Sequence, residues 1–172
     1  SVPPVAFGRP LADVFTTYLH QTQEFGGITV NAPNVYQWWS GVDVGLATRL
    51  AIVLSALSLA SLAALAYSRR RPVTSRSLVA YAALTLTVMP FVLPRMHERY
   101  FFPAELVTAV LAFTNRRARL SAALLQATST IAYLRFLGWP TIVPLTVDSL
   151  GVLVAIALTV QVYIDESTGH VV

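Results

Sequence analysis

The sequence predicts an all-α fold, a polytopic bundle of about five transmembrane helices preceded by a segment outside the membrane. Three observations support this class. Hydrophobic residues make up 55% of the 172-residue chain and charged residues only 12%, against roughly 25% charged residues in soluble domains. Apolar runs of helix length alternate with short polar connections. The arginines lie at the ends of these runs rather than on one polar face, which argues against a nucleic-acid-binding surface.

Residues 1–44 are predicted to form an extracytoplasmic segment that contains an interfacial helix. In its first half, apolar side chains recur at helical spacing, at Leu11, Val14, Phe15, Tyr18 and Leu19. An amphipathic helix of this kind lies in the membrane interface rather than across the bilayer. A polar turn then leads into Tyr36, Trp38 and Trp39, and such aromatic residues favour the headgroup level.

Five candidate spans follow, at about 45–67, 77–93, 101–113, 120–137 and 147–164. Each is apolar for most of its length and is followed within a few residues by a charged residue or a proline. The third is short for a span of about 20 residues, so it is expected to begin within the charged stretch before it. Asp165 and Glu166 end the fifth span, which leaves residues 165–172 as a tail.

The distribution of arginines sets the predicted orientation. Seven lie in one set of connections: Arg69, Arg70, Arg71, Arg76, Arg116, Arg117 and Arg119. Three lie in the other set: Arg9, Arg95 and Arg99. Because positive residues accumulate in short cytoplasmic loops, the first set is expected in the cytoplasm. The loop that contains His97 is then extracytoplasmic, and the C-terminal tail is cytoplasmic.

Residues 94–103 concentrate the charge that the apolar runs on either side avoid. We expect Arg95, His97 and Arg99 to form a lipid-phosphate site, because two guanidinium groups and an imidazole suit a phosphate headgroup. Glu98 and Tyr100 would orient these groups. The alternative is an ordinary charged loop with a salt bridge and an aromatic belt.

Two charges lie inside the predicted spans, Arg49 and Glu105. Each is about four residues from the outer end of its span, or roughly 6 Å at the rise of an α-helix. A charge at this depth is costly unless it is paired or hydrated. We expect Arg49 and Glu105 either to pair or to line one polar cavity. The alternative is that each side chain snorkels separately to the interface.

Motifs for metal binding or covalent catalysis are absent from the sequence. It has no cysteine, and its three histidines have no spacing typical of a metal site. It contains neither a glycine-rich phosphate loop nor a nucleophile elbow. We therefore expect no cofactor and no metal, and the residues alone identify no catalytic group.

The run 89–103, with Met96-His97-Glu98-Arg99-Tyr100 at its centre, resembles a motif of bacterial integral-membrane mannosyltransferases of the GT-C fold. These are related to the enzymes that add mannose to glycosylphosphatidylinositol anchors. In that family a proline, a basic residue and Met-His-Glu-Arg-Tyr follow a hydrophobic span. Residues 31–38 and 8–11 resemble the family's outer loop in the same order. The similarity covers most of this chain, which resembles the C-terminal part of such an enzyme.

The resemblance implies sugar transfer from a polyprenyl-phosphate donor on the extracytoplasmic side of the bacterial inner membrane. His97 and Arg99 would be the leading phosphate contacts, with Arg95 in support. The family has more spans and an essential acidic residue in an early outer loop, which this sequence does not match. Two functions follow: part of a transferase, or a non-catalytic accessory subunit of a larger, for example energy-transducing, membrane complex. Expected partners are membrane lipids, a polyprenyl-phosphate-sugar and other transmembrane chains, with no nucleic acid.

Overall fold

The computed structural model describes Gly8, Pro10 and residues 27–39, 41–68, 72–140 and 143–168. Within these ranges the fold is all-helical, as predicted. The α-helices are α3 (Val44–Tyr67), α4 (Ser75–Val92), α5 (Phe102–Thr114), α6 (Ala118–Phe136) and α7 (Leu145–Thr168), with two short 3₁₀ helices, η1 (Val35–Trp38) and η2 (Glu98–Phe101). The predicted interfacial helix lies outside the described residues.

Three of these helices, α3, α4 and α7, are long and apolar enough to cross a membrane. The prediction of five spans is therefore supported for three of them. The 13 residues of α5 extend only about 20 Å at the helical rise, less than a hydrocarbon core of roughly 30 Å. The 19 residues of α6 include serine, threonine, glutamine and arginine, which lower its apolar character.

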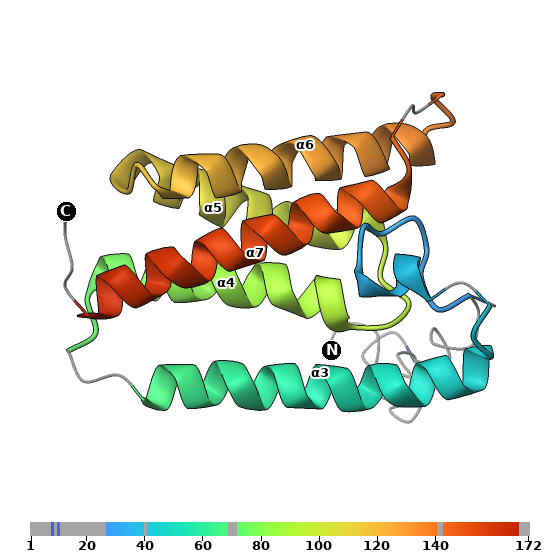
Figure 1. Cartoon of the computed structure of the whole chain (residues 1–172), viewed down its shortest axis with the longest axis horizontal. Helices are drawn as coiled ribbons and strands as arrows, with labels where there is room; N and C mark the ends of the chain where they lie inside the picture. The colour runs from blue at the N-terminus through green and yellow to red at the C-terminus, as the bar shows by residue number, and fades with distance from the viewer. Residues whose placement is uncertain are drawn as a thin grey trace.

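The helices run alternately up and down, so neighbours in sequence are antiparallel neighbours in space (Figure 1). Helices α4, α5, α6 and α7 form the bundle, and α3 packs along its edge against α4. The end at the right of Figure 1 holds η1, the loop before α5, and the first turns of α3 and α7. We call it the η2 end. The opposite end holds the α5–α6 connection with Arg116 and Arg117, and we call it the arginine end.

Small side chains allow the helices to approach closely. Buried alanines lie on all four helices of the bundle: Ala80, Ala83, Ala104, Ala118, Ala132 and Ala155. Between α6 and α7, the Ser121 hydroxyl donates to the Ala155 carbonyl over 2.9 Å and lies 2.6 Å from the Thr159 hydroxyl. Interfaces built from small residues and interhelical hydroxyl bonds are typical of helices that pack within membranes.

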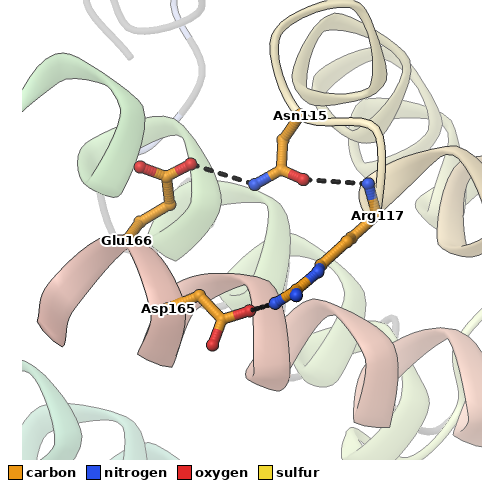
Figure 2. A network of polar contacts seen from close by, with 4 residues as sticks. All are labelled: Asn115, Arg117, Asp165 and Glu166. Carbon is orange, nitrogen blue, oxygen red and sulfur yellow. Dashed lines mark hydrogen bonds and ion pairs between the residues drawn. The ribbon is translucent and has the colours of Figure 1, made fainter. Parts of the chain in front are cut away.

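A polar network at the arginine end joins the α5–α6 connection to the last turns of α7 (Figure 2). Arg117 forms an ion pair with Asp165. The side-chain amide of Asn115 donates to Glu166 over 2.9 Å and accepts from the Arg117 backbone amide. Helix α7 continues to Thr168, past Asp165 and Glu166, where the fifth span was predicted to end. These partners offset the unfavourable position of two carboxylates at a helix C-terminus.

The carbonyl of Val92, in the last turn of α4, accepts two side-chain hydrogen bonds. One comes from the Tyr36 hydroxyl, and the other comes from the Ser55 hydroxyl over 2.9 Å. The last carbonyls of a helix have no intrahelical donor, so these bonds cap α4. They also join η1, α3 and α4. Burial raises the pKa of Tyr36 to about 12, which keeps this phenol a donor at neutral pH.

Replacing Tyr36 by phenylalanine should lower the free energy of unfolding by about 1–2 kcal/mol, because a buried hydrogen bond is lost. The folded pKa of about 12 exceeds the ordinary value of 10.0. The stabilisation is therefore complete below pH 10 and is lost as pH rises through 12, so the two proteins should converge in that window. Detergent-induced unfolding followed by circular dichroism measures the difference. Tyr67→Phe, at a site that is 93% exposed, is the matched control.

Gly151 in α7 packs against α6 without room for a side chain, because a Cβ there would lie 2.5 Å from Cγ2 of Thr128. Gly151→Ala should therefore destabilise the fold by about 1–3 kcal/mol through overpacking. Adding Thr128→Ser removes that methyl group and keeps the hydroxyl bond to Leu125. The double variant should regain most of the loss in the same unfolding assay. Equal stability of the single and double variants would contradict the assigned clash.

Candidate functional site

The charged loop between α4 and α5 is held by the N-terminal segment. The Arg95 amide donates to the Ile28 carbonyl over 2.6 Å, and the Val30 amide donates to the Met96 carbonyl over 3.1 Å. His97 makes bridge pairings with Val30 and Asn31. The loop is thus fixed by backbone bonds to a segment more than 60 residues earlier in the sequence.

The backbone of this loop is strained at Arg95, which has a φ of 60°. Residues other than glycine and asparagine rarely adopt this region, and such strain persists only where surrounding contacts impose it. The Arg95 side chain is partly buried, and its Nε atom has no hydrogen-bond partner among the described residues. The loop geometry is therefore imposed by the bonds to Ile28 and Val30.

The 3₁₀ geometry of η2 divides its four residues between two environments. Residues three apart lie on the same side of a 3₁₀ helix, and Glu98 and Phe101 are both buried, at 2% and 0% exposure. Arg99 and Tyr100 are exposed. The Tyr100 ring lies 6.1 Å from that of His97, centroid to centroid. The Glu98 side chain, which was predicted to orient its neighbours, is thus buried in the protein.

A pocket of about 410 Å³ opens between α6 and the η2–α5 segment. Its polar lining comes from both sides: Glu98, Arg99, Glu105, Gln126, Ser129 and Thr130. Phe102 and Tyr133 supply aromatic walls. Of the three predicted phosphate residues, Arg99 lines this pocket, whereas Arg95 and His97 do not. The charged loop and the pocket therefore meet at Glu98 and Arg99.

Two buried carboxylates line the pocket in different ways. Glu105 is 6% exposed, and its Oε2 accepts a hydrogen bond from the Gln126 side-chain amide over 2.9 Å. Glu98 Oε2 is also buried and has no partner in the part of the chain that the structure describes. An unmatched buried acceptor costs about 1–3 kcal/mol. Glu98 therefore combines a place in the pocket lining with a buried carboxylate oxygen that has no donor among the described residues.

The structure does not bring Arg49 and Glu105 together. Helix α3, which carries Arg49, packs on α4, whereas α5, which carries Glu105, packs on α4, α6 and η2. Arg49 is exposed. The side-chain amide of Gln126, rather than a guanidinium, is the donor to Glu105. The polar cavity considered for these two charges contains Glu105 without Arg49.

No protein-family model matches the chain, and no significant match was found among curated proteins or solved structures. The resemblance to membrane mannosyltransferases therefore stays a prediction that rests on the motifs.

The contribution of α6 to the site was missed from the sequence. Its pocket residues are Gln126, Ser129, Thr130 and Tyr133. Their spacing of three, four and seven places them on one face of a helix. A polar stripe at helical spacing inside an apolar run was the signal that would have identified this wall.

The bond between Gln126 and Glu105 can be tested by removing the donor. Gln126→Leu should lower the free energy of unfolding by about 1–3 kcal/mol, because Glu105 then loses its donor while remaining buried. Gln161→Leu makes the same change at an exposed position of α7 and should have an effect within about 0.5 kcal/mol. Both are measured by detergent-induced unfolding. Similar losses in the two variants would argue against the bond.

Proposed function

We propose that the chain binds the phosphate of a polyprenyl-phosphate-linked sugar, as the C-terminal part of a mannosyltransferase-like membrane enzyme. The observation that carries the proposal is the position of Arg99. It is an exposed guanidinium at the edge of a pocket that also contains buried Glu98. Arginine binds phosphate in a bidentate manner, and the pocket beside it leaves room for the group that the phosphate carries.

The rigidity and charge of the loop support phosphate binding. Arg95, His97 and Arg99 lie within five residues, and backbone bonds to Ile28 and Val30 already fix the loop. A preformed site avoids the entropy cost of ordering a loop upon binding. Arg95 and His97 would then act from beside the pocket rather than within it.

The surface of α5 supports a lipid-linked ligand. Large apolar residues on one side of this helix are exposed: Phe102 (59%), Leu106 (56%), Val110 (55%) and Phe113 (89%). Phe102 also lines the pocket. A prenyl chain whose phosphate meets Arg99 would have a continuous apolar surface along α5. The same stripe also suits contact with bilayer lipids.

In the proposed topology all five helices traverse the bilayer of the bacterial inner membrane. The η2 end is extracytoplasmic, and the arginine end, with residues 165–172, is cytoplasmic, in agreement with the positive-inside rule. Helix α5 is short for a full span, but it packs between α4 and α6, so its ends need not both reach the membrane surface.

A second candidate is a non-catalytic accessory subunit of a larger membrane complex, and the exposure of α3 favours it. Only 17% of the apolar window of α3 is buried, and its helix contacts are with α4. A partner helix would cover the apolar side chains that remain.

Co-purification separates the two candidates. A partner with an acidic outer loop supports the transferase, and a large unrelated complex supports the accessory role.

The phosphate contact is tested with the full chain in lipid nanodiscs and radiolabelled polyprenyl-phosphate-mannose. Arg99→Ala should weaken binding about tenfold or more, because a charge-assisted hydrogen bond contributes about 1.5–3 kcal/mol. Arg116→Ala removes an exposed arginine at the opposite end and should leave the affinity unchanged. If Arg99→Ala and Arg116→Ala bind the lipid equally well, the proposed function is wrong.

A further inference from the structure

We infer that α3 docks a partner transmembrane helix on the face that carries Arg49, and that this partner presents a carboxylate to Arg49. The inference rests on the second candidate function for the existence of a partner chain, and it adds the chemistry that the partner must carry. It does not depend on phosphate binding at Arg99. The evidence is the position of Arg49, its charge and the small residues that share its face.

Arg49 lies on the side of α3 that faces away from the bundle. Helix α3 lies along the edge of the bundle, beside α4, which supplies its helix contacts (Figure 1). The buried residues of α3 mark the side that faces the bundle: Ala47, Ala51, Ser55 and Leu62. Successive residues of an α-helix are about 100° apart around its axis. Arg49 is therefore on the opposite side, in agreement with its exposure.

The charge of Arg49 calls for an acidic partner. Charged residues inside transmembrane helices usually face the interior of a bundle or pair with an opposite charge. Arg49, in the second turn of α3, is exposed and forms no ion pair in the ranges that the structure describes. A carboxylate on a neighbouring helix would neutralise the guanidinium and could accept two parallel hydrogen bonds. The partner helix is therefore expected to carry aspartate or glutamate near its end on the same side of the membrane.

The residues that follow Arg49 on this face, toward the arginine end, are small. Ala56, Ala60 and Ala63 are all exposed, and they lie within about 40° of Arg49 around the helix axis. Larger exposed side chains flank them on both sides: Ile52, Leu57 and Leu59. Small residues at such spacing let two helix backbones approach closely and are enriched where transmembrane helices pack together. The face thus combines a surface for close helix packing with a charge near its outer end.

The same features select among the possible occupants of the face. Two copies of the chain in the same orientation would bring Arg49 to its own counterpart across a two-fold interface, where like charges repel. Lipid alone would let Arg49 snorkel to the headgroups, but it gives no role to three alanines in line on the same face. A helix that carries a carboxylate matches both the charge and the small residues.

The test uses the full chain in liposomes with a synthetic single-span leucine–alanine peptide that carries one glutamate at the depth of Arg49. The chain has no cysteine, so Ser68→Cys, at the exposed end of α3, holds a donor fluorophore and the peptide holds the acceptor. Energy transfer should show about tenfold tighter binding than for the same peptide with glutamine, because a charge-assisted bond is added. Arg49→Gln should abolish this difference. Arg76→Gln, at an exposed position in the first turn of α4, should preserve it.

Close packing on the alanines is tested by a second substitution. Ala60→Leu places a larger side chain on the face and should weaken the binding of both peptides about fivefold or more. Ala123→Leu, the same substitution at an exposed position of α6, should leave both affinities unchanged.

Equal binding of the glutamate and glutamine peptides by the chain with Arg49 intact would overturn the inference in favour of contact with lipid headgroups. This comparison requires no packing variant to fold. Stronger energy transfer between two labelled copies of the chain than between the chain and the glutamate peptide would overturn it in favour of self-association. The second candidate function fails separately, if the chain purifies from its native membrane without a partner. A preference for the glutamate peptide would then still establish the specificity of this face.

Discussion

The hydrogen bonds to the Val92 carbonyl determine the arrangement of the η2 end. Tyr36 and Ser55 bring η1 and α3 to the last turn of α4. Pro94 follows two residues later and cannot continue the helix. The chain therefore leaves α4 at a fixed point, and the charged loop begins beside the N-terminal segment. The backbone pairing of Arg95 and His97 with residues 28–31 depends on that position.

Because the chain leaves α4 at a fixed point, η2 places some of its side chains in the protein interior and others on the surface. Phe101 and Ala104 enter the same apolar cluster as Val92, together with Leu125 of α6 and Val152 of α7. Burial of Phe101 sets the rotation of η2, so Glu98, three residues earlier, also faces inward. Arg99 then faces outward at the edge of the pocket. The inward position of Glu98 and the outward position of Arg99 thus follow from the apolar packing of Phe101.

The sequence predicted the helices well because strong signals mark their ends. The expected span 45–67 corresponds to Val44–Tyr67, and 101–113 corresponds to Phe102–Thr114, since aspartate, arginine or proline flanks each run. The burial of Glu98 could not be predicted, because its neighbours in sequence are charged and only packing against α6 places it inside. The pairing of Arg49 with Glu105 was expected because both lie at the same depth inside their predicted spans. Depth in the membrane does not determine which helices are neighbours.

The polar side chains at the two ends of the bundle differ in how well their hydrogen bonds are satisfied. This difference favours the η2 end as the functional end. At the arginine end, Asp165 and Glu166 are matched by Arg117 and Asn115. At the η2 end, buried atoms lack hydrogen-bond partners in the described structure: Asn34 Nδ2, Arg95 Nε, Glu98 Oε2 and Asp148 Oδ2. Each costs about 1–3 kcal/mol when left unsatisfied. A fold of marginal stability retains such groups where a bound molecule or water recovers the cost.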